Sequence, residues 1–108
     1  MEMLTVPDVA ELLAVPVTEV RSRVKDGTFL SVRRDDGVLV LPAEQFDGTE
    51  LVKHFSGVLT LLRDAGYNDD EALRWLTTAD DTLPGTPLQA LHENRATEIK
   101  RRAQALAF

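Results

Sequence analysis

The fold of this chain is decided by residues 4–41, LTVPDVAELLAVPVTEVRSRVKDGTFLSVRRDDGVLVL. Thr5 and Asp8 form a capping pattern, and apolar residues then recur at helical spacing. A cap followed by this spacing is the usual start of an amphipathic helix, because one apolar face can then be buried. The pattern predicts a first helix from about Thr5 to Ala14.

A second helix is predicted after a tight turn. Pro16 interrupts the first helix, because proline disfavours helical geometry for the residue before it. Val20 and Val24 restore the helical spacing, and Asp26-Gly27 ends it. Two short helices joined by such a turn are the signature of a helix-turn-helix, in which Val15 would fill the corner between them.

A two-stranded wing is predicted directly after the two helices. Phe29–Arg34 and Val38–Leu41 are strand-like, and Asp35-Asp36-Gly37 between them is a typical hairpin turn. Pro42 then ends the second strand. One helical turn from Ala43 to Phe46 would return the Phe46 ring to the core under the wing.

The remainder of the chain, beyond a junction at Asp47-Gly48-Thr49, is predicted to be helical. Helices are expected around Ser56–Ala65, after the N-cap Asn68, after Thr86-Pro87 and from about Thr97 to Leu106. Trp75 is expected to fill the core of this part, as are Phe29, Phe46, Phe55 and Tyr67 in their segments. The fold class is therefore mainly α with a small two-stranded β wing. It divides into a winged helix-turn-helix module at residues 1–46 and a helical C-terminal domain at residues 51–108, packed together because the junction is short.

Size and composition limit the classes of protein to consider. The chain has 108 residues and 44% apolar content, enough for one ordinary domain or two small ones. It has no cysteine, which excludes disulfides, a thiolate nucleophile and a sulfur-ligated metal site. It shows neither a signal-peptide pattern nor an apolar run long enough to cross a membrane. We therefore expect a soluble, cytoplasmic protein.

The distribution of charge matters more than its sum. The formal charge is -6, which opposes nucleic-acid binding because Lys and Arg supply most of the affinity for phosphate. Between Arg21 and Arg34, however, the sequence holds five basic residues and one acidic residue, Asp26. Acidic residues crowd the segments on either side. Any positive field is therefore local to this stretch.

The candidate DNA-contacting residues on the second helix lie off its Val20/Val24 apolar face. They are Val17, Thr18, Arg21, Ser22 and Lys25. Arg21 is expected to contact a base, because an Arg can grip guanine with two hydrogen bonds worth about 1–3 kcal/mol of discrimination. Lys25 is expected to meet phosphate. The alternative is an exposed helix face kept soluble by charge, which Glu19 and Asp26 nearby favour.

The wing adds Arg33 and Arg34 to the candidate DNA contacts. Strand alternation forbids both from pointing the same way, so one could reach a minor groove or phosphate while the other follows the sheet. Asp35 and Asp36 at the tip would repel phosphate. Either they hold the tip away from the DNA backbone, or the hairpin is merely a polar turn, and the sequence leaves both open.

No catalytic or metal site is expected. His54 and His92 are far apart and lack Cys, Asp or a second His at ligand spacing. The sequence offers no phosphate-binding glycine loop and no serine with a plausible base. We therefore expect that the protein is not an enzyme and needs no cofactor. Arg95 and the basic run Lys100-Arg101-Arg102 are explained as charges that favour a helix C-terminus.

The first 46 residues resemble the winged helix-turn-helix of the MerR and excisionase type, through the segment LTVPDVAELLAVP (residues 4–16) and its continuation to Phe46. The whole chain resembles a small actinobacterial family of DNA-binding proteins that join this module to a helical C-terminal domain. The C-terminal motifs that carry this likeness are GVLTLL (57–62), DAGY (64–67), RWL (74–76), PLQALH (87–92) and RRAQALAF (101–108).

The resemblance also bears on regulation and partners. The family includes proteins whose N-terminal tail is phosphorylated by a Ser/Thr protein kinase, but this sequence starts almost at its first helix, so we expect no such tail here. The segment from Trp75 to Leu88 is also similar to the C-terminal domain of Xre-type antitoxins, where that region mediates protein contacts.

The sequence thus predicts a DNA-binding protein of the cytoplasm and nucleoid, acting as a transcriptional regulator or nucleoid-associated factor. Its recognition helix would enter the major groove and its wing would rest on the flanking backbone. A homodimer formed through the C-terminal helices would let two modules bind two half-sites. The alternative is an antitoxin- or adaptor-like module that binds a protein partner and has little DNA affinity.

Overall fold

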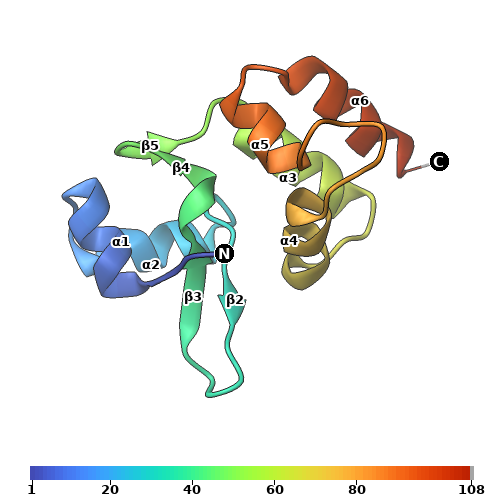
Figure 1. Cartoon of the computed structure of the whole chain (residues 1–108). Coiled ribbons are helices and arrows are strands. Elements are labelled where there is room, and N and C mark those ends of the chain that lie inside the picture. Colours follow the sequence, from blue (N-terminus) through green and yellow to red (C-terminus); the bar gives the residue numbers. More distant parts are fainter. Residues whose placement is uncertain (108) are drawn as a thin grey trace. The chain divides into compact units, whose positions relative to one another are not determined.

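The computed structural model describes residues 1–107, so Phe108, the last residue of the predicted C-terminal domain, lies outside the described part (Figure 1). The chain divides into two units. The first, Met1–Leu51, is called here the winged unit, and the second, which starts at Val52, the helical unit. Among the described residues, no helix is long and apolar enough to cross a membrane.

The winged unit begins with the two predicted helices, α1 (Val6–Leu13) and α2 (Val17–Lys25). Thr5 caps α1 as expected: its hydroxyl accepts from the Asp8 N–H at 3.4 Å, and the Asp8 carboxylate accepts from the Thr5 N–H at 3.1 Å. The chain turns at Ala14, which adopts a left-handed conformation. Val15 then packs against the core, which confirms its predicted place at the corner.

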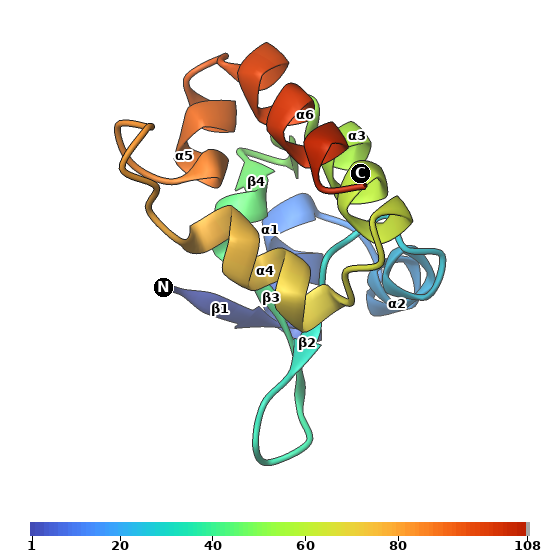
Figure 2. The same cartoon turned by 90° about the vertical axis from the view of Figure 1, so that its right-hand side faces the viewer.

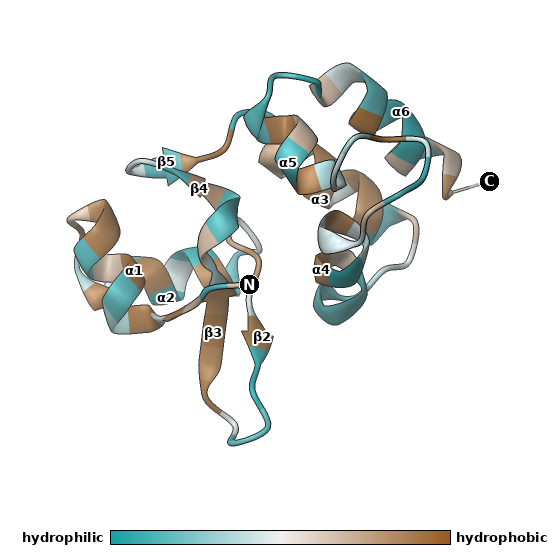
Figure 3. Ribbon diagram, in the orientation of Figure 1, coloured by the Kyte–Doolittle hydropathy of each residue, from teal (hydrophilic) through white to brown (hydrophobic). Residues whose placement is uncertain are grey.

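The sheet of the winged unit has three antiparallel strands rather than the two predicted. They are β1 (Met3–Thr5), β2 (Val32–Arg33) and β3 (Leu39–Pro42), in the order β1-β3-β2. β1 pairs with β3 from Met3 opposite Pro42 to Thr5 opposite Val40, so the chain start joins the wing. Figure 2 shows the loop between β2 and β3 extending beyond the strands, and Figure 3 shows β3 as hydrophobic.

The first wing strand is shorter than predicted. The sequence predicts strand from Phe29 to Arg34, but of these residues Val32 and Arg33 alone pair with β3. The reason is Gln45, whose fully buried amide replaces a neighbouring strand. Its Oε1 accepts from the Leu30 N–H at 2.9 Å, and its Nε2 donates to the Leu30 carbonyl at 2.8 Å and to the Pro42 carbonyl at 3.3 Å. With its backbone satisfied in this way, Leu30 does not join the sheet.

The helical turn predicted after the wing is a 3-10 helix, Ala43–Gln45, and Phe46 then enters the core as expected. The Phe46 and Phe29 rings meet edge to face, with centroids 5.2 Å apart. The segment predicted as the domain junction forms a hairpin, β4 (Phe46–Asp47) and β5 (Glu50–Leu51), and the boundary between units follows it.

The helical unit contains the predicted helices. They are α3 (Phe55–Asp64), α4 (Asp69–Thr77), α5 (Pro87–His92) and α6 (Ala96–Ala105). Capping boxes start two of them: Asn68 with Glu71 for α4, and Thr86 with Gln89 for α5. The fully buried side chains of this unit include Leu62, Leu76 and Ile99. The fold class predicted from the sequence, mainly α with a small β wing, is confirmed.

Trp75 and Tyr67 are less buried than predicted. The expectation was a core residue, but Trp75 is partly buried, as is Tyr67, whereas Phe29, Phe46 and Phe55 are buried as predicted. On α4 the inner face is taken by Ala72 and Leu76, each fully buried. Trp75 lies three residues after Ala72, so its side chain lies at the edge of this inner face and is covered only in part.

Candidate nucleic-acid interface

The outer face of α2 carries the five residues predicted to contact DNA. Val17 is 37% exposed, and Thr18, Arg21, Ser22 and Lys25 are exposed, whereas Val20 between them is fully buried. Val17, Arg21 and Lys25 recur every fourth residue and so share one side of the helix. α2 is thus held to the core by Val20 and presents these residues outward, as a recognition helix requires.

The wing and α2 share a hollow in the winged unit. Arg21 from α2 and Arg33 from β2 both line it, together with Gly37 and Val38 of the wing loop and with Leu39 of β3. The remaining lining residues are Thr5, Val6 and Pro7. Sequence reasoning placed Arg21 and Arg33 in the interface separately. It did not predict that the start of α1 would join them, because nothing local in the sequence shows that β1 pairs with the wing.

Two of the five basic residues of this region form ion pairs with acidic side chains. Arg23 forms an ion pair with Glu19 at 3.2 Å, and its guanidinium lies 5.8 Å from the centre of the Phe29 ring. Arg34 forms an ion pair with Asp36 at 2.9 Å. Both pairs are partly exposed, so their contribution to stability is small. Their main consequence is that Arg23 and Arg34 have acidic neighbours that compete with phosphate.

The other three basic residues of this region have no acidic partner in the part of the chain that the structure describes. Within residues 1–107, no acidic side chain lies within ion-pair distance of Arg21, Lys25 or Arg33. Arg33 donates instead to the Gly37 carbonyl at 2.8 Å, which ties its side chain across the wing loop without cancelling its charge. The α2–wing surface, defined by Val17, Thr18, Arg21, Ser22, Lys25, Arg33 and Arg34, therefore has a net positive field at Arg21, Lys25 and Arg33.

The wing arginines have different partners in the wing loop, and because Arg34 lies outside β2, their predicted alternation across the sheet stays a prediction. Arg33 bonds to the loop backbone and Arg34 to a carboxylate of the loop. The Arg34 side chain, together with the Val38 N–H, holds the pKa of Asp36 below its ordinary value. Asp36 is therefore ionised at neutral pH and engages Arg34. Asp35, the other acidic residue of the tip, is exposed and could still repel phosphate. Whether the acidic tip keeps the wing away from DNA therefore stays a prediction.

The start of α2 offers further donors. Pro16 is the N-cap, and the helix has no side-chain cap there. The Glu19 N–H donates to the Pro16 carbonyl at 3.0 Å, which leaves the N–H groups of Val17 and Thr18 uncapped at the end of the helix where its dipole is positive. Such N–H groups are common phosphate contacts in protein–DNA complexes. These two N–H groups extend the surface beyond the basic side chains.

Basic residues of the helical unit are arranged differently. Arg102 pairs with Glu98 at 2.7 Å and with Asp80 at 3.4 Å, and Arg95 pairs with Glu93. Lys100 lies 3.1 Å from the His54 Nδ1 and joins α6 to the start of α3. Arg102 also lies in the last turn of α6, as the predicted helix-end role requires. In the part of the chain that the structure describes, no group of three or more His, Asp or Glu side chains could hold a metal ion.

Both units match family models. Residues 1–46 match the model described as "DNA-binding protein Rv2175c, wHTH domain", where wHTH stands for winged helix-turn-helix. Residues 52–107 match the model described as "Rv2175c C-terminal domain of unknown function". The chain belongs to the Rv2175c family. The family resemblance found in the sequence is thereby confirmed, whereas the MerR or excisionase subtype stays a prediction.

Individual members of the Rv2175c family extend the match over the whole chain. DNA-binding protein Rv2175c of Mycobacterium tuberculosis is 40% identical over 114 residues, which cover 94% of this chain and 78% of that protein. The NMR structure of Rv2175c superposes with a TM-score of 0.89 at 39% identity, covering 99% of this chain and 82% of the other. The assignment of the winged helix-turn-helix is therefore supported by both sequence and structure.

Proposed function

We propose that this protein binds double-stranded DNA with the α2–wing surface, α2 lying in the major groove and the wing on the flanking backbone. The observation that carries the proposal is the group of three basic residues, Arg21, Lys25 and Arg33, that have no acidic partner in residues 1–107. The family model matched by this unit is that of a DNA-binding domain, and the M. tuberculosis relative is named a DNA-binding protein.

The roles within this surface follow from side-chain chemistry. Arg21, at the middle of the exposed side of α2, is proposed to read guanine, because its planar guanidinium can donate two parallel hydrogen bonds to a base edge. Lys25 at the end of the helix is proposed to contact phosphate. Arg33 is already oriented by the Gly37 carbonyl and is proposed to contact the backbone or the minor groove next to the wing.

The biological role proposed is that of a transcriptional regulator or a nucleoid-associated factor in the cytoplasm. A homodimer through the C-terminal helices is part of this proposal, because one winged module reads only a half-site and high-affinity operators usually contain two. We propose no enzymatic activity and no cofactor. The competing function, an antitoxin- or adaptor-like module, is favoured by the acidic tip at Asp35 and Asp36, which repels phosphate.

The decisive experiment is fluorescence anisotropy with random and genomic promoter duplexes at two salt concentrations. The proteins are wild type, Arg21→Ala and the control Arg101→Ala, which removes an exposed basic residue from α6. We expect salt-dependent binding by wild type and control, and a loss of about tenfold for Arg21→Ala. If wild type fails to bind at low salt, DNA binding is abandoned in favour of a protein partner.

A further inference from the structure

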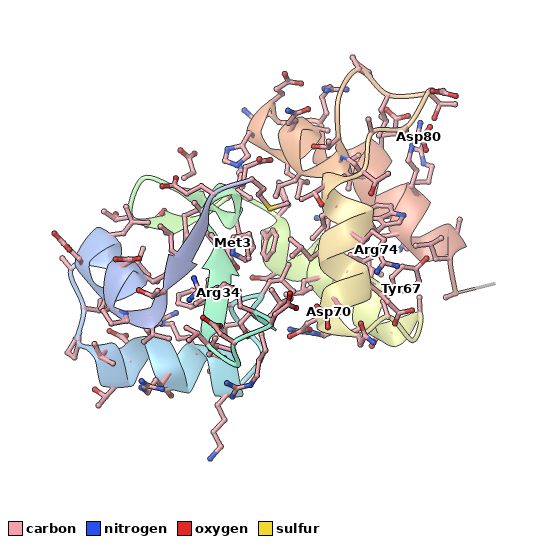
Figure 4. The ribbon with its side chains drawn as sticks, turned by 60° about the horizontal axis from the view of Figure 1, so that its bottom comes forward. Met3, Arg34, Tyr67, Asp70, Arg74 and Asp80 are labelled. Carbon is pink, nitrogen blue, oxygen red and sulfur yellow. The ribbon has the colours of Figure 1, made fainter. Side chains whose placement is uncertain are left out.

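The outer side of α4 carries a hollow of about 340 Å³ that the DNA-binding proposal does not use. Its lining residues, called here the α4 stripe, are Tyr67, Glu71, Arg74, Trp75 and Thr78. Figure 4 shows Tyr67 and Arg74 on the same side of this helix. The stripe lies away from the inner face of α4, where Ala72 and Leu76 are fully buried.

Trp75 is the unusual member of this surface. It is the single tryptophan of the chain and is partly buried. Trp75 and Thr78 also line a second hollow of about 130 Å³, together with residues that include Leu83, Pro87 and Arg102. Trp75 thus lines two hollows. Trp, Tyr and Arg are the residue types that most often dominate protein–protein binding energy, and the two hollows contain all three.

The order of residues along the stripe is self-complementary. When two identical helices pack antiparallel about a two-fold axis, each contact between two positions occurs twice. An axis at the level between Ala72 and Leu73 places Glu71 opposite Arg74 of the second copy, and Arg74 opposite its Glu71. The same axis places Tyr67 opposite Thr78. Trp75 falls opposite Asp70, whose carboxylate can accept a hydrogen bond from the indole N–H, and the two helix dipoles oppose each other favourably.

Both charged groups are available for such pairing. In the described part of the chain, Arg74 has no acidic side chain within ion-pair distance. The Glu71 Oε1 accepts from the Asn68 N–H at 3.0 Å, which leaves Oε2 to accept from a guanidinium. One carboxylate and one guanidinium give the stripe no excess charge. That balance favours a copy of the same surface over a strongly charged ligand such as nucleic acid.

We propose that the α4 stripe is a self-association surface, on which a second copy of this chain packs with its α4 antiparallel and forms two Glu71–Arg74 ion pairs. This inference deepens the proposed dimerisation and rests on it, but not on DNA binding. One helix face buries less than the roughly 1,200 Å² typical of stable complexes, so the dimer is a concentration-dependent one. Two modules bound on one DNA would be held together by the same contact.

Sedimentation velocity of the full chain without DNA, over a wide concentration range, tests the proposal. We expect wild type to shift from monomer toward dimer, with a blue shift of Trp75 emission as the indole is covered. Arg74→Glu should remain a monomer, because it places like charges opposite each other. Arg101→Glu is the matched control: it makes the same charge change at an exposed site outside the stripe and should behave as wild type.

A mixing experiment tests whether Glu71 of one copy pairs with Arg74 of the other. Arg74→Glu has two acidic side chains on the stripe and Glu71→Arg has two basic ones, so each alone should be monomeric and an equal mixture should form a heterodimer. Glu71 also caps α4, so Glu71→Gln serves as a second partner that keeps the hydrogen bond to Asn68 and should restore one ion pair. Circular dichroism verifies that each variant is folded.

Three results would overturn the proposal: a monomeric wild type at every concentration, equal weakening by Arg74→Glu and Arg101→Glu, or no heterodimer in either mixture. Binding to a duplex with one half-site separates this inference from the proposed function. Arg74→Glu should bind such a duplex as wild type does. If wild type dimerises but binds no DNA, the stripe stands and the DNA-binding proposal fails.

Discussion

The two units carry similar numbers of basic residues but use them differently. Residues 1–51 contain ten acidic and five basic side chains, a net charge of -5, and all five basic residues fall between Arg21 and Arg34. Residues 52–108 contain eight and seven, a net charge of -1. The more acidic unit is nevertheless the one with the basic surface. Net charge is therefore a poor guide to binding, because phosphate responds to the field at short range.

The ion pairs of the basic residues add to this contrast between the two units. In the described part of the chain, three basic side chains of the winged unit and four of the helical unit have no acidic partner. In the winged unit they are Arg21, Lys25 and Arg33, on one surface. In the helical unit they are Lys53 in the segment before α3, Arg74 on α4, and Lys100 and Arg101 on α6, where Lys100 contacts His54. Clustering of unpaired charge, and not its amount, distinguishes the proposed DNA-binding unit.

The largest expected effect comes from removing the cluster. Arg21→Ala/Lys25→Ala/Arg33→Ala should weaken DNA binding at least about 100-fold and reduce the salt slope by about 1 to 2, depending on whether Arg33 joins Lys25 in contacting phosphate. Lys53→Ala/Arg74→Ala/Arg101→Ala removes the same charge from the helical unit and should leave half-site binding within about twofold of wild type. Anisotropy titrations with a half-site duplex measure both, and equal losses would refute the contrast between the units.

The second expected effect concerns stability. Gln45→Leu leaves the Leu30 N–H and carbonyl buried without partners and should cost about 2–4 kcal/mol of unfolding free energy. Gln104→Leu makes the same change at an exposed position of the helical unit and should stay within about 0.5 kcal/mol of wild type. Urea unfolding measures the difference. A small effect at Gln45 would mean that water or a shifted backbone satisfies Leu30.

A third variant should increase binding. Asp36→Asn removes the acidic partner of Arg34 and should strengthen DNA binding about threefold, with a salt slope steeper by up to about 1. Asp81→Asn makes the same charge change at an exposed position in the helical unit and should have no effect on half-site binding. Unchanged binding by Asp36→Asn would show that the wing tip does not approach phosphate, which is the open question about the acidic tip.

The smallest expected effect is on how the stability of the winged unit depends on pH. Hydrogen bonds from Thr5 lower the pKa of Asp8, and those from Thr28 lower the pKa of Asp26, so each ionised carboxylate stabilises the winged unit. This contribution is present at neutral pH and is lost as pH falls below about 4 through the lowered pKa values. Asp8→Asn should therefore show a flatter dependence of melting temperature on pH than wild type. An equal dependence in both proteins would contradict this assignment.

Local chemistry made part of this fold predictable. The capping pairs Thr5–Asp8 and Asn68–Glu71 set the starts of α1 and α4 where the sequence placed them. The error at Phe29–Arg34 has a non-local cause, because Gln45 satisfies Leu30 from fifteen residues away. β1 has three residues, too few for a strand pattern to be recognised.

The same distinction applies to the candidate site. The exposed side of α2 follows from helical spacing around Val20, so its residues could be named from the sequence. The hollow shared by Arg21 and Arg33, and the pairing of Arg34 with Asp36, depend on how the wing folds back. Likewise, helical spacing alone did not tell whether Trp75 would lie with Ala72 and Leu76 on the inner face of α4.

The contacts of Gln45 have a consequence for protein engineering. Its amide holds Leu30 before the wing and Pro42 after it, so one side chain fixes both ends of the hairpin. The loop beyond Val32 and Val40 can then be treated as an exchangeable cassette. Hairpins of other lengths or sequences could be grafted onto this base, which would turn the winged unit into a scaffold whose reach along a duplex is chosen by design.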